Sequence, residues 1–254
     1  MTVSHQPHQM RPGVYTRVLS VIVPAYNEAS VIRVALERLM EVLDEFLTDY
    51  EVIVVNDGSE DKTAQVVESM SELFPKLRLE TYERNQGKGH ALRRGLAVSG
   101  GQMVVFFDGD LDIHPESIPT LIRHLERGGY DAVVASKLHP ESRVKYPWLR
   151  RVFSRCFYAF VWLFLRLPVT DTQVGLKVFK GDVLRTIIHL PQVDGFAFDV
   201  ELLALIHRAG FKIGEGPVWI TYREFPSYVG PLAVIRALVD TVRVSYRLRM
   251  RKRP

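Results

Sequence analysis

The feature that most constrains this chain is the alternation, through its first half, of short apolar runs with longer amphipathic stretches. The runs "VLSVIVPA", "EVIVV" and "MVVFF" are apolar at almost every position, so a strand formed by any of them has apolar side chains on both faces. The stretch after the first run repeats apolar residues at helical spacing, as at Val31, Ala35 and Leu39. Strands that are apolar on both faces need cover on both sides. We therefore predict an α/β fold with a mostly parallel sheet covered by helices.

The same pattern gives the expected order of elements. Asn27 and Ser59 precede the first two amphipathic stretches, and we predict that they cap the helices there. The sequence shows no internal repeat and no low-complexity tract. Strands are expected within residues 18–27, 51–59, 77–83, 101–108 and 131–136, and helices within 28–47, 59–74, 87–99 and 114–128.

Polar residues gather where the predicted strands end. Ligands of open α/β sheets bind at the carboxyl ends of the strands, so residues that follow different strands come together there. Lys88 lies in the glycine-flanked loop "NQGKGHA", where backbone amides and an ammonium group suit phosphate. We predict a nucleotide and metal pocket at this edge. Its predicted donor-binding residues are Pro24, Ala25, Tyr26, Glu28, Asp57, Lys88, Asp108, Gly109 and Asp110.

The segment "FFDGDLDIHPE" places Asp108, Asp110 and Asp112 at alternate positions. Taken alone, a D-x-D pair is more often a simple turn. A calcium loop of the EF-hand type is excluded, because Ile113 and Pro119 stand where that loop needs Gly and Glu. Three close carboxylates repel one another unless a cation lies between them. We predict that they hold Mg²⁺ or Mn²⁺, hard cations that prefer oxygen ligands.

Composition narrows the class of protein. The chain has 254 residues and a formal net charge of +4. Its single Cys156 excludes an internal disulfide framework and fits a reducing compartment. We expect a flexible stretch at residues 1–14, a catalytic domain at 15–228 and a basic amphipathic helix at 229–254. The cations that cluster in this last segment are Arg243, Arg247, Arg249, Arg251, Lys252 and Arg253.

Membrane contact is expected at a surface rather than through a span. The longest apolar run, residues 156–165, is half as long as a spanning helix needs to be. It lies in a predicted interfacial helix at about 145–167 that is rich in aromatic residues and arginine. A buried core helix is the alternative there. The basic segment near the C-terminus suits an anionic leaflet. We expect a peripheral, monotopic enzyme at the cytoplasmic face of a membrane.

Taken together, these motifs resemble family 2 glycosyltransferases with the GT-A fold. The resemblance rests on "VIVPAYNE", "VIVVNDGSEDKT", "NQGKGHALRRG" and "FFDGDLDIHPE". The segments "DTQVGLKVFK" and "GFAFDVELLALIHRAGFKIGEGPVWITY" look like the polyprenyl-phosphate hexosyltransferases, dolichyl-phosphate glucosyltransferases above all. The resemblance implies transfer of a hexose, most readily glucose from UDP-glucose, to a polyprenyl phosphate with inversion. GDP-mannose as the donor, or a soluble acceptor, stays an alternative.

The resemblance also implies roles for residues. Tyr26 and Glu28 would frame the nucleobase and ribose, Asp57 would recognise the base, and Lys88 would lie near the base or phosphates. Asp108 and Asp110 match the metal-binding pair, while Asp112 would join through water. The implied catalytic residues are Asp110, Arg143 and Asp171, and the implied acceptor-phosphate residues are Lys137, Arg143, Lys145 and Gln173.

A phosphate acceptor also bears on the mechanism. A phosphate monoester is largely dianionic at neutral pH and needs no general base. Asp171 is then an orienting or metal-linked group, with a role as catalytic base as the weaker alternative. A nucleic-acid-binding module is disfavoured, because no nucleic-acid fold signature accompanies the basic tail. A homo-oligomer is left open.

Overall fold

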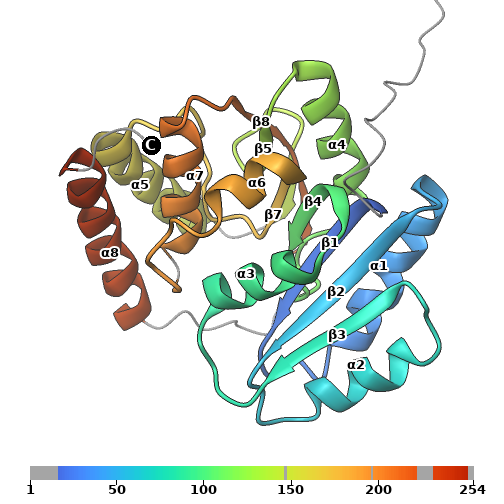
Figure 1. The fold of residues 1–254 in the computed structure, drawn as a ribbon. Helices are drawn as coiled ribbons and strands as arrows, with labels where there is room; N and C mark the ends of the chain where they lie inside the picture. The colour runs from blue at the N-terminus through green and yellow to red at the C-terminus, as the bar shows by residue number, and fades with distance from the viewer. Residues whose placement is uncertain (1–16, 146–147, 196, 222–230, 251–254) are drawn as a thin grey trace, which may run out of the picture.

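The computed structural model describes residues 17–145, 148–195, 197–221 and 231–250. A seven-stranded sheet with the order β3-β2-β1-β4-β7-β5-β8 forms the centre of the molecule (Figure 1). A second sheet pairs only two short strands, β6 Arg143–Lys145 and β9 Trp219–Thr221. The strands of the main sheet are β1 Arg17–Ala25, β2 Tyr50–Asp57, β3 Leu77–Tyr82, β4 Gly101–Phe107, β5 Ala132–Ser136, β7 Leu176–Lys180 and β8 Ile213–Pro217.

The helices cover both faces of the main sheet, as the apolar strands require. Two buried clusters result, one under α1, α2 and α4 and the other under α3, α6 and α7. Every residue of β2 is buried, which explains the apolar run from Val52 to Val55 at its centre. The helices are α1 Ile32–Phe46, α2 Thr63–Ser71, α3 Lys88–Val98, α4 Ser117–Gly128, α5 Trp148–Leu165, α6 Gly181–Ile187, α7 Phe198–Arg208 and α8 Pro231–Met250.

The predicted α/β architecture is confirmed, with one addition. Strands β1, β2, β3 and β4 pair in parallel, and so do β5 and β8. Strand β7 runs antiparallel between β4 and β5. Its sequence, "LKVFK", lies within a segment that sequence reasoning treated as a family motif rather than as a strand. The remaining strands share one direction, so their carboxyl ends meet at one edge.

The two predicted helix caps are wrong. Helix α1 begins at Ile32 and α2 at Thr63, each without a side-chain cap hydrogen bond. Asn27 instead adopts a left-handed backbone with φ of 57° and accepts a hydrogen bond from the Glu60 amide at 2.9 Å. The Ser59 hydroxyl accepts from the Asn27 amide at 2.9 Å. These side chains therefore tie the loops after β1 and β2 to each other, at the edge where the site forms.

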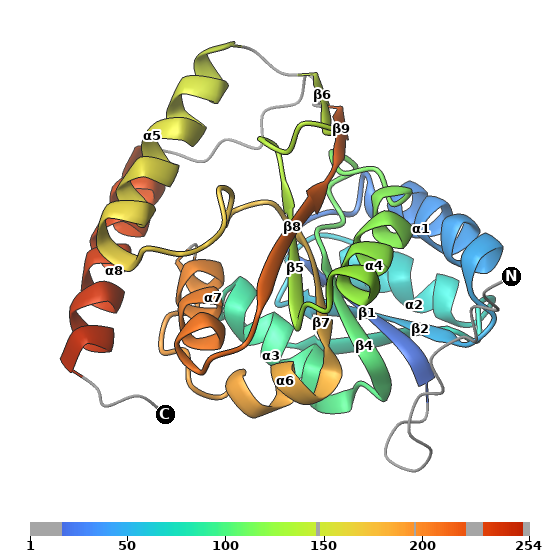
Figure 2. The same ribbon diagram turned by 90° about the horizontal axis from the view of Figure 1, so that it is seen from above.

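Helices α5 and α8 pack on each other at one side of the molecule, beside α7 (Figure 2). The Ser245 hydroxyl donates a hydrogen bond of 2.9 Å to the Phe164 carbonyl, which links the two helices. Within the described residues, no helix is both long enough and apolar enough to cross a membrane. The predicted boundaries near residues 14 and 228 lie outside the described residues.

Candidate active site

The loop after β4 carries the aspartates, and Asp108 is held there from two sides. Its amide donates a hydrogen bond of 2.9 Å to the Gly175 carbonyl. Its Oδ1 lies 2.7 Å from the Lys88 ammonium nitrogen, Nζ. A Cβ on Gly175 would collide with the Asp108 carboxylate, so this close approach requires glycine at 175. Nearby, Gly109 lies against Val23 and Ile32, which fixes the loop to the core.

Asp110 is the least compensated acid of the loop. Its Oδ1 accepts a hydrogen bond of 3.1 Å from the Asp112 amide. Burial, and next the charge of Asp108, raise the pKa of Asp110 to about 7. No ion pair joins Asp110 within the described part of the chain. The site is therefore short of positive charge at this carboxylate.

The donor set fits Mg²⁺ or Mn²⁺ as a site of two carboxylates. Among the described residues, no group of three or more His, Cys, Asp or Glu side chains is arranged to hold a metal. Mg²⁺ in phosphate-binding sites commonly takes one or two carboxylates and completes its shell with phosphate oxygens and water. The uncompensated charge of Asp110 beside Asp108 suits that arrangement. A direct ligand role for Asp112 stays a prediction.

Lys88 connects this loop to a second, deeper ion pair. Its Nζ also lies 3.7 Å from Asp199 of α7. Asp199 in turn lies 3.0 Å from the Lys177 ammonium, and both side chains are almost completely buried. Burial alone lowers the pKa of Lys88, but Asp108 and Asp199 outweigh it, so the net pKa is raised. Lys88 is thus held as a cation directly against the predicted metal-binding pair.

Sequence reasoning did not single out Lys177 or Asp199. Lys177 lies on β7, between Leu176 and Val178, and donates to the Val174 carbonyl at 2.7 Å. A lysine in a buried strand and an aspartate in the first turn of an apolar helix are the signals that were available. Because buried charges are costly unless paired, each of these residues implied a partner. The sequence does not say that the two pair with each other.

The predicted nucleotide-binding residues lie at the ends of β1 and β2. Pro24 and Ala25 close β1, where Ala25 lies opposite Asn56 of β2. Tyr26 is 43% exposed and its ring is free to stack on a base. Burial, then Asp61 and Asp108, raise the pKa of Glu28. The structure therefore brings these residues to the same edge as the aspartates.

Asp57 is buried and already organises the neighbouring loop. Its Oδ1 accepts hydrogen bonds from the Tyr82 hydroxyl and the Gln86 amide, both at 2.7 Å. Its Oδ2 accepts from the Gly87 amide at 2.9 Å. Asp57 thus fixes the chain that leads into Lys88, and its recognition of a base stays a prediction.

On the predicted acceptor side, Asp171 and Lys137 form a pair. The Lys137 ammonium lies 3.0 Å from Asp171 Oδ2, and both side chains are largely buried. Asp171 Oδ1 accepts from the Gln173 amide at 3.1 Å. The Gln173 side-chain nitrogen Nε2 is buried and lacks a hydrogen-bond partner within the described residues. A buried donor left unsatisfied is the feature expected of a group that awaits a ligand oxygen.

Glu215 of β8 fixes the backbone at Thr170 and Asp171. The sequence did not predict this role. Glu215 Oε1 accepts from the Thr170 amide at 2.6 Å and from the Asp171 amide at 3.2 Å. The Thr170 hydroxyl donates to the same oxygen at 2.8 Å. The position of Asp171 is therefore determined by the main sheet. In the sequence, Glu215 appears only as an acid in a glycine-rich strand.

Arg143 lies on the small sheet, whose other strand is bonded through its backbone to the aspartate loop. Its guanidinium carbon lies 5.2 Å from the centre of the Trp219 ring, within cation–π range. Strand β9, which contains Trp219, is joined by backbone to the loop: the His114 amide donates to the Trp219 carbonyl, and the Thr221 amide to the Asp112 carbonyl, both at 3.0 Å. Lys145 lies on β6 with Arg143, and its side chain is outside the described residues.

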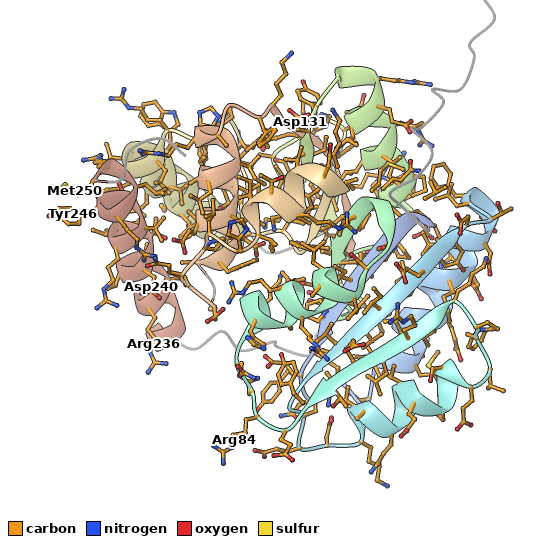
Figure 3. All side chains as sticks on the ribbon, in the orientation of Figure 1. Arg84, Asp131, Arg236, Asp240, Tyr246 and Met250 are labelled. Carbon is orange, nitrogen blue, oxygen red and sulfur yellow. The ribbon has the colours of Figure 1, made fainter. Side chains whose placement is uncertain are left out.

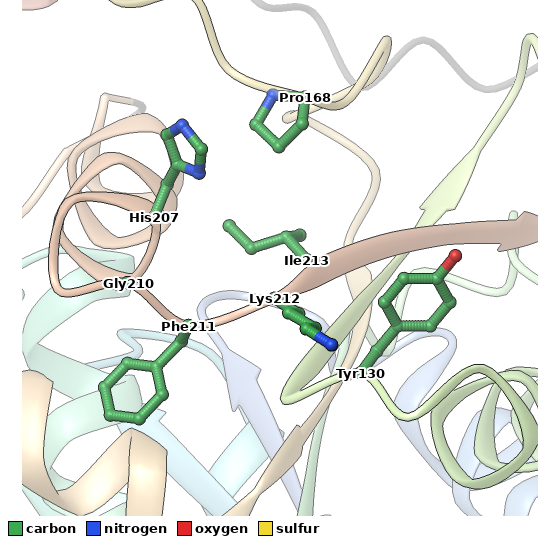
Figure 4. A pocket seen from close by; sticks show the side chains of 7 residues that line it. All are labelled: Tyr130, Pro168, His207, Gly210, Phe211, Lys212 and Ile213. Atoms are coloured by element: carbon green, nitrogen blue, oxygen red, sulfur yellow. The ribbon is translucent and has the colours of Figure 1, made fainter.

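A separate hollow of about 360 Å³ lies elsewhere (Figure 4). Tyr130, His207, Lys212 and Ile213 are among the residues that line it. Lys212 directly precedes β8, and Tyr130 is separated from β5 only by Asp131, so the hollow lies at the amino ends of those strands. The aspartates lie at the carboxyl ends, and this hollow is therefore not part of the candidate active site.

Known proteins are similar to this chain over most of its length. AglD of Haloferax volcanii is 32% identical over 218 residues, which cover 84% of this chain and 35% of AglD. The dolichyl-phosphate beta-glucosyltransferase of Dictyostelium discoideum is 31% identical over 244 residues, covering 90% of this chain and 74% of that protein. The chain thus spans about a third of the first relative and three quarters of the second.

A solved structure shows the same fold. Glucosyl-3-phosphoglycerate synthase from Mycobacterium tuberculosis, in complex with Mn²⁺, UDP and phosphoglyceric acid, matches with a TM-score of 0.67 at 23% identity. The match covers 95% of this chain and 84% of that one. The family model for glycosyl transferase family 2 matches residues 20–188, well over half of the chain. With the aspartate pair and Lys88 at the carboxyl edge of a GT-A-like sheet, the chain belongs to glycosyltransferase family 2.

Proposed function

We propose that this protein transfers a hexose from a nucleotide sugar to a polyprenyl phosphate with inversion, and that glucose from UDP-glucose is the first candidate. The observation that carries the proposal is the partly buried pair of Asp108 and Asp110 beside Lys88, joined through β9 to the strand of Arg143. The aspartates and Lys88 suit the diphosphate of a nucleotide sugar, and Arg143 suits a phosphate acceptor. The named activity of the Dictyostelium discoideum relative supports the choice of substrates.

On the donor side, the chain supplies charge and shape. Asp108 and Asp110 would hold Mg²⁺ or Mn²⁺, which when bound would neutralise the leaving nucleoside diphosphate. The Lys88 ammonium adds a fixed positive charge beside the same carboxylates. The M. tuberculosis structure of this fold was solved with Mn²⁺ and UDP, which supports this choice of metal and nucleotide.

On the acceptor side, a phosphate oxygen would form the bond to the anomeric carbon as the bond from that carbon to the diphosphate breaks. The acceptor dianion needs no deprotonation at neutral pH, so no protein base is required. Arg143 would bind its oxygens through charge-assisted hydrogen bonds, and the Gln173 side-chain nitrogen Nε2, which lacks a partner among the described residues, would donate another. Asp171, engaged by Lys137 and by backbone amides, would orient these groups.

We also propose that α5 and α8 place the site at a membrane surface, on the cytoplasmic face. On α8, the exposed side chains Val239, Val242, Tyr246 and Met250 follow one another at helical spacing. They lie on one face of the helix, and Figure 3 marks Tyr246 and Met250 at its outer side. On α5, Trp162 is 51% and Leu163 is 63% exposed. Aromatic and apolar side chains of this kind bind the lipid–water interface, where a polyprenyl phosphate acceptor resides.

The test is a panel of radiolabelled UDP-glucose and GDP-mannose, each offered with polyprenyl phosphate or with 3-phosphoglycerate, and with Mg²⁺ or Mn²⁺. Label from UDP-glucose in the lipid extract is expected. Label from GDP-mannose in that extract would revise the sugar. Label in the aqueous product with phosphoglycerate alone would replace the lipid acceptor with a soluble one.

Asp110→Asn is the matched control for that panel. Because burial and Asp108 disfavour the ionised carboxylate, its replacement by a neutral amide is not expected to lower the melting temperature. Metal-dependent turnover should fall by two orders of magnitude or more, on the order of the cost of removing one transition-state charge partner. Near-normal turnover of a folded Asp110→Asn enzyme would show that the assigned metal role is wrong.

A further inference from the structure

Arg247 of α8 turns towards the protein rather than towards solvent. Its Nη1 lies 2.9 Å from Glu201 Oε1 and donates to the Gln192 side-chain oxygen at 2.7 Å. Its side chain is 26% exposed, against 71% for Arg243 one turn earlier on the same helix. Sequence reasoning placed Arg247 in a cluster of cations directed at a leaflet. The structure removes it from that cluster, because its charge is already used inside the molecule.

Glu201 is the buried centre of this contact. It lies on α7 and is 1% exposed. While Oε1 faces Arg247, Oε2 accepts hydrogen bonds from the amides of Gln192 and Val193 at 2.8 and 2.9 Å. A buried carboxylate with this many donors is strongly ordered. The segment of residues 192–194, which precedes α7, is therefore tied to α8 through one carboxylate.

The same segment lies against the start of α3. The Asp194 carbonyl accepts a hydrogen bond of 2.9 Å from the Gly89 amide, and the Asp194 carboxylate pairs with Arg93. Gly87 has a φ of 94°, and a Cβ there would come within 2.7 Å of the Asp194 carbonyl oxygen. Between the two glycines is Lys88, the cation that contacts Asp108. The contacts thus run without a break from α8 to the donor site.

We infer that Arg247 is a positioning residue for donor binding: through Glu201 and residues 192–194 it fixes the start of α3, and with it Lys88. The seating of α8 on α7 then sets the affinity for a nucleoside diphosphate. This inference rests on the proposed function. If α8 also contacts the membrane, the same helix both binds the lipid surface and fixes the position of Lys88 in the donor site.

The experiment compares Arg247→Ala with Arg243→Ala in solution, without vesicles. Both variants remove one arginine from α8, but among the described residues Arg243 forms an ion pair only with Asp240 of its own helix. UDP with Mn²⁺ is titrated into each protein by calorimetry. We expect Arg247→Ala to weaken UDP binding by about fivefold or more, the lower end of typical coupling between sites, and Arg243→Ala to leave it unchanged. Arg247→Lys should recover part of the loss, since Lys restores the charge but on an ammonium whose reach and geometry differ from those of the guanidinium.

Hydrogen exchange of the ligand-free proteins gives an independent reading. In Arg247→Ala, the amides of Gln192, Val193 and Gly89 should exchange faster than in the wild type, and in Arg243→Ala they should not. A folded Arg247→Ala protein with unchanged UDP affinity overturns the inference. If Arg247→Ala fails to fold, Glu201→Gln supplies the same comparison, because it keeps an acceptor for the backbone amides and loses the ion pair.

The two proposals fail in different ways. A wild-type protein that binds neither UDP nor GDP with Mg²⁺ or Mn²⁺ contradicts the proposed function. A wild-type protein that binds UDP, with an Arg247→Ala variant that binds it equally well, contradicts only the inference.

Discussion

Acidic side chains outnumber cations where β1 and β4 end, and this imbalance explains much of the behaviour of the site. Glu28 and Asp110 both have raised pKa values, first through burial and then through neighbouring carboxylates. Lys88 forms an ion pair with Asp108, whereas Asp110 has no ion pair in the described part of the chain. The site is thus prepared for a ligand that brings positive charge. Binding of a metal–diphosphate complex would relieve a repulsion that the fold sustains.

Single residues were predictable where a local motif carries them. The three aspartates follow a buried strand directly, and their spacing alone raised the question of a cation. Lys177 and Asp199 are separated by more than twenty residues, and they meet only because β7 inserts beside β4 and α7 packs over it. A partner of that kind is a property of the tertiary structure. The sequence indicated that each of these charges needed a partner, but it did not indicate which residue the partner is.

Replacing Arg143 tests the acceptor at the residue scale. Arg143→Ala should raise the KM for polyprenyl phosphate and lower kcat/KM by roughly ten- to a hundred-fold, the range for a hydrogen bond to a charged group. The KM for the nucleotide sugar should change little. Arg143→Lys should recover only part, since Lys lacks the paired geometry. Steady-state kinetics with each substrate varied measures both constants, and Arg127→Ala on α4 is the control.

The same kinetics carry a pH test. Since the dianionic acceptor is the nucleophile, kcat/KM should fall as pH drops through about 6, where a phosphate monoester gains a proton. A profile that moves on mutation of Asp171, and not on a change in the acceptor's own pKa, would identify Asp171 as a general base and the acceptor as a hydroxyl.

Among whole elements, the strands and helices of the first half were predictable because their periodicities differ. Buried parallel strands read as continuous apolar runs, and α1 and α4 repeat apolar residues at helical spacing. Strand β7 was not predicted because it has only five residues and two of them are lysines. One of these, Lys177, is buried through its ion pair, so its charge hid a core strand. The two predicted helix caps are wrong because these side chains bond to the opposite loop. The Asn27 side chain accepts a hydrogen bond from the loop after β2, and the Ser59 hydroxyl accepts one from the loop after β1.

Asp131, labelled in Figure 3, joins three strands where β5 begins. Its Oδ1 accepts from the Lys180 ammonium of β7 at 2.8 Å, and its Oδ2 from the Lys212 amide before β8 at 2.9 Å. Burial alone raises the pKa of Asp131, but the Lys180 and Lys212 hydrogen bonds outweigh it, so its pKa lies below the ordinary value of 3.8. This stabilisation is complete above pH 3.8 and is lost as pH falls through the lower, folded-state pKa.

Asp131→Asn should therefore lower the free energy of unfolding at neutral pH by about 1 kcal/mol, a figure kept small because Lys180 is solvent-screened. The difference from the wild type should shrink as pH falls below about 4. Urea unfolding at a series of pH values measures it. Lys180→Met removes the ion pair but keeps the backbone bond, so it should cost less than Asp131→Asn. An equal difference at every pH would contradict the electrostatic account.

At the scale of the whole molecule, α5 and α8 stand apart from the sheet (Figure 2). Both helices carry exposed apolar side chains. The amphipathic character of these two helices was predictable from the sequence. Which of the arginines on α8 bond to the protein was not predictable. Arg247 and Arg249 both contact the protein, at Glu201 and at the Phe164 carbonyl. The outward face of α8 is therefore more apolar than the arginine-rich sequence suggested. If it binds a membrane, apolar burial should supply a large part of the binding energy.

That account predicts how binding to lipid vesicles responds to mutation and to salt. Val242→Ser combined with Tyr246→Ser removes apolar surface from the exposed face of α8, and each lost side chain should cost about 1.5 kcal/mol, or about tenfold in affinity. The loss should persist at high salt, because ions screen charges but not apolar contacts. Leu73→Ser on the exposed side of the molecule near α2 is the control, since Leu73 is 71% exposed and lies off this face. Flotation on vesicles with anionic lipid, at low and high salt, measures all three proteins. Unchanged flotation of the double variant would exclude this face as the membrane contact, and a matching loss of self-association in sedimentation would assign it to a second copy of the chain.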